Sequence, residues 1–213
     1  MASFVLTGRR DMRMLDRGVD GFLYAATYTR QARPPAVLRR HPVVMLNCLT
    51  EDPRTPAVVP DELAAGRTAA RVLLEAGHTE HIYLIGETPP EVYADAQRPA
   101  GIRERLNDRV AFGAYQALQE AGMDIPADVS VISFDDSDLA SWLRPQLSSI
   151  AIPHFELGRR AVELLLAEHR DGGVERVRMP LRDRASVTAP AARRGGTRPG
   201  RARAARRRTT AGA

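Results

Sequence analysis

The sequence predicts an α/β fold in which parallel strands are covered by helices on both faces. Short apolar runs that are typical of buried strands alternate with amphipathic, helix-like segments along the chain, which is the pattern of βαβ units. Two of the helix-like segments end alike, in Glu75-Ala76-Gly77 and in Glu120-Ala121-Gly122. Glycine directly after the last helical turn is a common helix stop, so both segments indicate a helix that leads into a strand.

The first half of the chain contains short strands and one well-delimited helix. Val43-Val44-Met45-Leu46 is continuously apolar, as expected of a strand buried on both faces. Asp61 is a favourable N-cap and Gly77 a favourable stop for the helix between them, with Leu73 on its inner side. The expected elements are strands at 4–6, 20–25, 42–46 and 81–86, helices at 11–17 and 61–76, and a polar, proline-rich loop at 47–60.

The second half of the chain contains a strand that ends in two carboxylates. The β-rich run at 129–134 is followed by Asp135 and Asp136, at the carboxyl end of a strand, where open α/β sheets place their ligand-contacting groups. A helix at about 109–121 precedes this strand. A strand near Ser148, an amphipathic helix that opens near Gly158 and a strand near Val177 are expected to follow it.

The positive charge of the chain is concentrated at its C-terminus. All 31 basic residues are arginine, and the formal net charge is +5. Eight of these arginines and no acidic residue lie in the last 21 residues, so the other 23 arginines against 26 acidic residues give the rest of the chain a net charge of −3. The body of the protein therefore has no overall electrostatic attraction for nucleic acid.

The C-terminal segment 191–213 is rich in Arg, Ala, Gly, Thr and Pro, and we expect it to be disordered because such a composition cannot bury a core. One interpretation is weak, non-specific contact with DNA phosphates. The other is an extension without function that reflects GC-rich coding sequence. The arginines that would contact DNA are Arg193, Arg194, Arg206, Arg207 and Arg208.

Several functional classes lack support in the sequence. Its apolar runs are much shorter than the roughly 20 residues that span a bilayer, and its N-terminus lacks the basic-then-apolar order of a signal peptide. The single cysteine, Cys48, excludes an internal disulfide. Nucleophile-elbow, dinucleotide-binding and metal-binding motifs are absent, and Asp135 to Asp138 lacks the glycine of a calcium loop. We therefore expect a cytoplasmic protein without membrane contact, enzyme activity, cofactor or metal.

Several stretches, in a fixed order along the chain, resemble the effector-binding domain of lactose-repressor-type (LacI/GalR) transcription regulators. They are Ala76-Gly77-His78, Arg98-Pro99-Ala100-Gly101, Asn107 to Gly113, Ser133-Phe134-Asp135 and Leu143 to Ser149. The resemblance implies the periplasmic-binding-protein-like type I fold, with two lobes built on parallel sheets. On this basis we expect an incomplete N-terminal lobe at 1–106, the remainder of the C-terminal lobe at 107–190 and the disordered tail at 191–213.

The sequence departs from this family in ways that affect both lobes. Nothing in the chain resembles the DNA-binding headpiece, and the first strand and helix of the effector domain are absent. Only five residues separate Gly101 from Asn107, whereas a parallel crossover alone needs a dozen or more. We infer an internal deletion that fuses two helices into one at about 98–121. The second lobe would then be incomplete, with strands near Val129, Ser148 and Val177.

The resemblance also implies a site for a small polar effector of the sugar or nucleoside class. The implied ligand-binding residues are Arg98, Asp135, Asn47 and Asn107. Asp135 would accept hydroxyl hydrogen bonds, Arg98 would donate a planar fork, and the two asparagines would do both. Each residue also has a plainer interpretation: Asn47 would cap a loop, Asp135 a short helix, Asn107 would sit inside the fused helix, and Arg98 would be solvated.

The sequence therefore supports the ligand-sensing domain of a LacI-family transcriptional regulator, which the family suggests is a homodimer. Its specific DNA binding would require the missing headpiece. The alternatives are a non-sensing remnant or oligomerising fragment of such a regulator, or a cytoplasmic sugar-binding protein.

Deleting residues 191–213 should abolish any DNA binding by the chain, because the remaining body carries a net charge of −3. The binding that the tail supports should weaken steeply with salt, since each neutralised phosphate releases counterions. A mobility-shift titration at two salt concentrations, with an operator-like and a scrambled duplex, measures this. Salt-resistant preference for one duplex would contradict the prediction.

Overall fold

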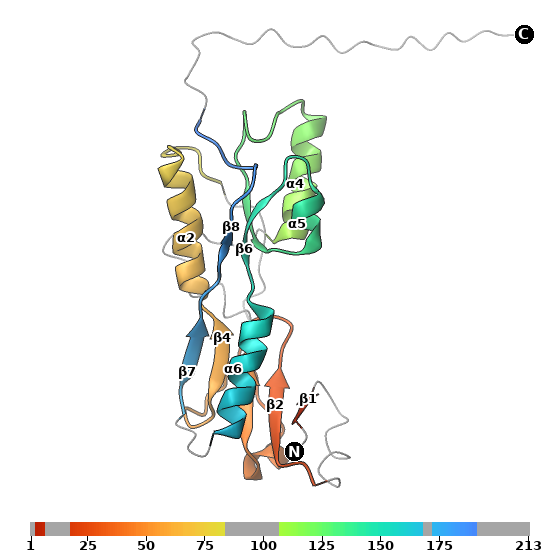
Figure 1. The fold of residues 1–213 in the computed structure, drawn as a ribbon, viewed down its shortest axis with the longest axis vertical. Helices are drawn as coiled ribbons and strands as arrows, with labels where there is room; N and C mark the ends of the chain where they lie inside the picture. Colours follow the sequence, from red (N-terminus) through yellow and green to blue (C-terminus); the bar gives the residue numbers. More distant parts are fainter. Residues whose placement is uncertain (1–2, 7–17, 84–106, 168–171, 191–213) are drawn as a thin grey trace, which may run out of the picture.

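The computed structural model describes residues 3–6, 18–83, 107–167 and 172–190, and contains two sheets that lie one above the other along the long axis of the molecule (Figure 1). The first sheet has five parallel strands, and the second has two parallel strands and one antiparallel strand. In sheet order they are β1 (Ser3–Leu6), β2 (Gly21–Ala25), β3 (Val43–Leu46), β4 (Ala57–Pro60) and β7 (Val174–Val177), then β5 (Ile132–Asp135), β6 (Ser148–Ala151) and β8 (Leu181–Arg182).

Four α-helices and one 3-10 helix lie in the described residues, and α-helices pack on both sheets. They are the 3-10 helix η1 (Ala36–Arg40) and the α-helices α2 (Glu62–Glu75), α4 (Asp108–Glu120), α5 (Asp138–Trp142) and α6 (His154–Leu166). The predicted strands at 4–6, 20–25 and 42–46, the carboxylate pair at the end of β5 and the helix after Asp61 are confirmed. Asp61 is the N-cap of α2, and its side chain accepts a hydrogen bond from the backbone N–H of Ala64.

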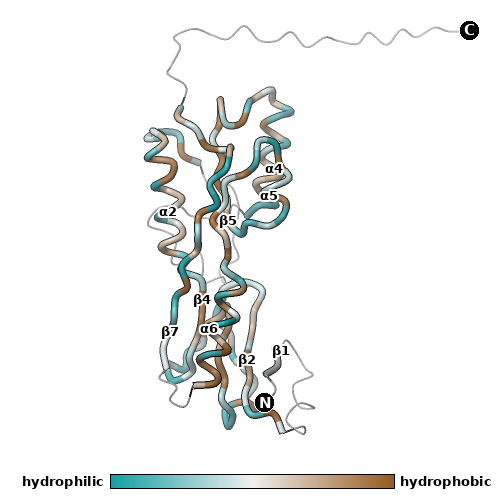
Figure 2. Tube along the Cα trace, in the orientation of Figure 1, coloured by the Kyte–Doolittle hydropathy of each residue, from teal (hydrophilic) through white to brown (hydrophobic). Residues whose placement is uncertain are grey.

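The first lobe consists of the first sheet and α6. Leu157, Ala161 and Leu165, spaced four residues apart on one side of α6, pack against Leu23 of β2 and Val44 of β3. Figure 2 shows the alternation of apolar and polar residues along this helix. Because side chains alternate across a strand, Phe22, Met45 and Val59 face the opposite side of the sheet.

The second lobe consists of the second sheet between α2 on one face and α4 with α5 on the other. Ala65, Ala69 and Leu73 of α2 pack against Ile132 and Phe134 of β5. Ser133, the residue between these two on β5, instead hydrogen-bonds to Asp108 of α4. The α/β fold with helices on both faces of a sheet, predicted from the sequence, is thus confirmed.

The expected division of the chain into lobes needs correction, because the described part of the chain passes between the lobes three times. It crosses from β4 to α2, from β6 to α6, and from β7 to β8. The helix at 61–76, expected in the first lobe, covers the second sheet, and the strand near Val177, expected in the second lobe, pairs with β4. A single boundary at 106/107 therefore does not separate the lobes. Alternation of strands and helices shows that a helix covers a sheet, but not which of two sheets.

Three local expectations also change. The predicted loop at 47–60 contains the strand β4. This short apolar run follows Pro56 and ends at Pro60, and it forms a strand because β3 and β7 flank it. In the predicted strand at 81–86, residues 81–83 are exposed and form no strand, and 84–86 lie outside the described residues. The fused helix at 98–121 is wrong at its junction, because α4 begins at Asp108 after an extended Asn107. The predicted helix at 11–17 and the tail at 191–213 also lie outside the described residues.

Cys48 should be unreactive in the folded protein. Its side chain is fully buried and lies 3.3 Å from the carbonyl oxygen of Tyr24, and burial raises the pKa of the thiol to about 11. Native protein should therefore react negligibly with a thiol reagent at pH 8, whereas denatured protein should react with one equivalent. Because the folded thiol holds its proton longer than the unfolded one, stability should fall only as the pH rises from about 9 towards 11. Rapid labelling of the native protein would contradict this.

Candidate functional site

The carboxyl ends of the parallel strands in the two sheets face each other. β4 leads directly into α2 of the second lobe, so the parallel strands of the first sheet end towards the second lobe. β6 leads into α6 of the first lobe, so β5 and β6 end towards the first lobe. Residues that follow strands in either sheet therefore lie at the junction of the lobes (Figure 1). Ligands bind at this end of open α/β sheets.

Asp135 and Asp136 form a strained turn at this junction. Asp135, the last residue of β5, has φ 104°, and Asp136 has φ 54°. Such conformations cost about 1–3 kcal/mol for a residue other than glycine, and persist only where the surroundings enforce them. The helix α5 follows this turn, and its N-cap residue is Ser137. The alternative interpretation, in which Asp135 caps that helix, is therefore wrong.

The Asp136 side chain is held by two arginines from the segment around β8. Its Oδ1 accepts a hydrogen bond of 2.5 Å from Arg184 Nη2, and its Oδ2 lies 3.5 Å from Arg182 Nε. The Asp136 and Arg184 side chains are only 16% and 18% exposed. Arg184 also donates to the carbonyl oxygen of Leu147, just before β6. The pair therefore ties the turn after β5 to the segments beside β6 and β8, the other two strands of the second sheet.

Asn107 lies beside the same turn. Its backbone forms an isolated parallel bridge with Phe134, the residue before Asp135. Its side-chain Oδ1 accepts a hydrogen bond of 3.0 Å from the backbone N–H of Val110, so Asn107 is the N-cap of α4 rather than a residue inside a helix. Two of the residues predicted to bind the effector, Asn107 and Asp135, are thus brought together by adjacent backbone segments.

Asn47 lies at the carboxyl end of β3 in the first lobe, also with a positive φ, of 55°. Its Oδ1 accepts a hydrogen bond from Thr29 Oγ1 at 2.8 Å, and its Nδ2 donates one to the carbonyl oxygen of Ala26 at 3.1 Å. The side chain therefore joins the segments that follow β2 and β3, as in the loop-capping interpretation. Arg98, the fourth predicted ligand-binding residue, lies outside the described residues, as do Arg193, Arg194, Arg206, Arg207 and Arg208.

A buried carboxylate that the site prediction did not include lies beneath the turn. Asp108, the first residue of α4, is 1% exposed and accepts hydrogen bonds from the hydroxyls of Ser133, Ser137 and Ser149. The sequence carried a signal for it: Ser133 and Ser149 interrupt apolar strands, and buried hydroxyls need partners.

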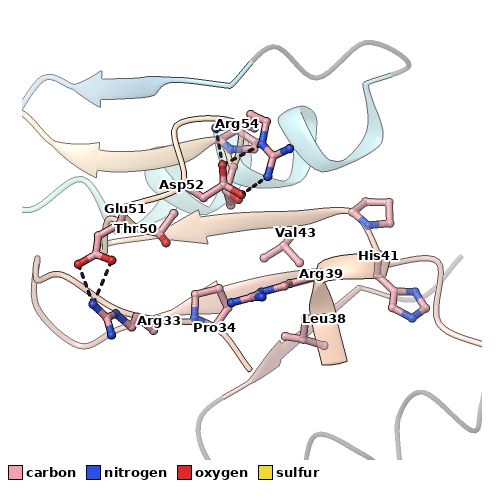
Figure 3. A pocket seen from close by; sticks show the side chains of 13 residues that line it. Arg33, Pro34, Leu38, Arg39, His41, Val43, Thr50, Glu51, Asp52 and Arg54 are labelled. Atoms are coloured by element: carbon pink, nitrogen blue, oxygen red, sulfur yellow. Dashed lines mark hydrogen bonds and ion pairs between the residues drawn. The ribbon is translucent and has the colours of Figure 1, made fainter. Parts of the chain in front are cut away.

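A cavity of about 860 Å³ lies in the first lobe between η1 and the β3–β4 loop (Figure 3). Arg33 pairs with Glu51 there, and the Arg54 guanidinium that bonds to Asp52 holds the pKa of that carboxyl below its usual value. Of the residues predicted to bind the effector, the three in the described part of the chain, Asn47, Asn107 and Asp135, do not line this cavity. Sequence patterns gave no signal for it, because its wall is built from segments that are adjacent only after folding.

Comparison with known proteins identifies the family. Residues 39–187 match the periplasmic binding protein-like domain. The chain is 28% identical to the ribose operon repressor of Escherichia coli, in an alignment that covers 79% of this chain and 64% of that repressor. It is similar to a solved putative LacI-family transcriptional regulator from Rhizobium etli (TM-score 0.73, 24% identity, 83% of this chain and 81% of that one). It is also similar to a LacI-family regulator from Enterococcus faecium with bound ribose (TM-score 0.64, 26% identity, 83% of each chain).

These matches and the two-sheet architecture place the chain in the periplasmic binding protein-like family. Within that family it is similar to LacI-type transcriptional regulators. The chain spans 64% of the length of the Escherichia coli repressor that it matches.

Two further observations concern the described part of the chain. It contains no helix long and apolar enough to cross a membrane. Among residues 18–83, 107–167 and 172–190, no three His, Cys, Asp or Glu side chains are grouped so that they could hold a metal ion.

Replacing Arg184 with Gln should destabilise the second lobe, because the poorly exposed Asp136 carboxylate loses its closest cation. We expect the free energy of unfolding to fall by about 1–3 kcal/mol, the usual effect of removing a hydrogen bond to a charged group. Arg182→Gln is the matched control: Arg182 is 57% exposed and lies 3.5 Å from the same carboxylate, so its removal should cost less than about 1 kcal/mol. Urea titrations of both variants measure the difference, and equal losses would contradict the assignment.

Proposed function

We propose that this chain is the sugar-sensing domain of a LacI-family transcriptional regulator, and that the sugar binds at the junction of the two lobes. The observation that carries the proposal is the set of polar residues at facing strand ends. Asn47 follows β3 in the first lobe, and Asp135 ends β5 in the second lobe, with Asn107 on the segment beside it. The solved LacI-family regulator from Enterococcus faecium has bound ribose, and the similar repressor from Escherichia coli is the repressor of the ribose operon.

The chemistry of these residues suits a polyhydroxylated ligand. A carboxylate can accept hydrogen bonds from two neighbouring hydroxyls, and an asparagine amide can donate and accept. Hydrogen bonds to an ionised acceptor are about twice as strong as neutral ones, so Asp135 should provide the largest share of the affinity. Arg98 remains part of the proposal as a planar donor.

The remaining elements of the proposal come from the family. We propose a homodimer that acts in the cytoplasm, has no enzyme activity, and regulates transcription in response to a sugar. Sequence-specific DNA recognition would need a headpiece, since the body of the chain carries a net charge of −3.

Asp135→Asn should weaken sugar binding by about 10-fold or more, because the amide loses one acceptor and the negative charge. Asparagine tolerates a positive φ better than most residues, so the turn that Asp135 occupies should be kept. Isothermal calorimetry with D-ribose, sucrose and adenosine, together with thermal shift, measures the effect.

Asp52→Asn is the control for this experiment. It changes a carboxylate that lines the 860 Å³ cavity of the first lobe and should leave affinity unchanged. Loss of affinity in Asp52→Asn alone would move the ligand to that cavity. A wild-type chain that binds none of the three compounds would favour the non-sensing fragment.

A further inference from the structure

We propose that Asp108 is a positioning residue of the site, which fixes the turn Asp135–Ser137 through Ser149 and Ser137 without contacting the ligand itself. The role of the turn in sugar binding rests on the proposed function. The fixing of the turn rests on the contacts of Asp108 alone.

Asp108 is placed to act as a clamp. It is 1% exposed, and both of its carboxylate oxygens are occupied. Oδ1 accepts from Ser133 Oγ at 2.5 Å and from Ser149 Oγ at 3.0 Å. Oδ2 accepts from the backbone N–H of Ser137 at 2.6 Å and from its hydroxyl at 2.8 Å. One side chain therefore binds α4, β5, β6 and the turn together.

Ser149 connects Asp108 to the strained part of the turn. Its hydroxyl donates to Asp108 and its oxygen accepts from the backbone N–H of Asp136 at 3.1 Å. Together with the bond from Ser137 N–H to Asp108, this fixes two successive backbone amides directly after Asp135. A residue with φ 104° persists only where its surroundings enforce it, and these two bonds provide that enforcement.

A carboxylate suits position 108 because four donors converge on its two oxygens. The N–H of Ser137 can only donate, so it requires an oxygen there. An asparagine could keep its oxygen towards Ser137, but its NH₂ group would then face the hydroxyls of Ser133 and Ser149, which would have to turn round to accept. An ionised acceptor also makes the shorter, stronger bonds that are seen here.

Ser133 and Ser149 form a matched pair that tests the idea. They are register partners on β5 and β6, both are fully buried, and both donate to the same oxygen of Asp108. Only Ser149 also accepts from the Asp136 amide. Replacing either with Ala removes one hydroxyl of equal burial, whereas only Ser149→Ala should release the turn.

The experiment measures two properties of the full chain and of both variants. Hydrogen exchange followed by NMR reports protection of the Asp136 amide, and calorimetry reports affinity for D-ribose. We expect Ser149→Ala to lose protection at Asp136 and to bind D-ribose about 10-fold more weakly, the size of effect seen when a residue that orients a ligand-binding group is removed. Ser133→Ala should retain both properties, at a similar loss of thermal stability.

Each outcome decides between the two proposals. Equal weakening in both variants, or unchanged Asp136 protection in Ser149→Ala, would overturn the positioning role. If wild type does not bind D-ribose, the ribose form of the proposed function fails, while exchange at Asp136 still decides whether the network fixes the turn. Should Ser149→Ala not fold, two variants replace it: Ser149→Thr, which keeps the hydroxyl, and Asp108→Ala, which removes both acceptor oxygens. The first should keep Asp136 protected, and the second should lose protection at Ser137.

Discussion

The passages of the chain between its two sheets constrain the rest of this molecule. Each of the three passages in the described residues leaves the carboxyl end of a strand in one lobe and enters the other lobe, which sets the parallel strands of the two sheets end to end. Polar residues that follow strands in two separate sheets consequently meet at one junction. Without the crossings from β4 and β6, the ends of β3 and β5, with Asn47 and Asp135, would not face the same junction.

The sequence predicted the local structure of this molecule better than its connectivity. Apolar runs located β2, β3 and β5, and Asp61 located the start of α2, because burial on both faces and helix capping are local constraints. The strand β4 was hidden between two prolines and depends on flanking strands far away in sequence. The partner sheet of α2 and β7 was not predictable from periodicity, since an apolar stripe fits either sheet equally well.

The candidate site shows the same limit. Asp135 at the end of a strand was predictable, but its backbone conformation was not, because that conformation depends on Asp108, Ser149 and Arg184, which lie 13 or more residues away. The short interval between Gly101 and Asn107 predicts a fused helix, with Asn107 in its interior. Its amide instead caps α4, so the asparagine marks the start of a helix and not its interior.

The positions of residues with a positive φ are themselves an argument for function. Besides the exposed His81, the described non-glycine residues with a positive φ are Asn47, Asp135 and Asp136, which lie at or just after the ends of strands at the junction of the lobes. Glycine would adopt these conformations without strain, yet each position carries an amide or a carboxylate. Asp136 has a structural reason, its bonds to Arg184 and Arg182. Asp135 has the most extreme φ of the three, and the clamp on the amides that follow it keeps a carboxylate where glycine would be more stable. Strain that is retained in this way is characteristic of binding sites.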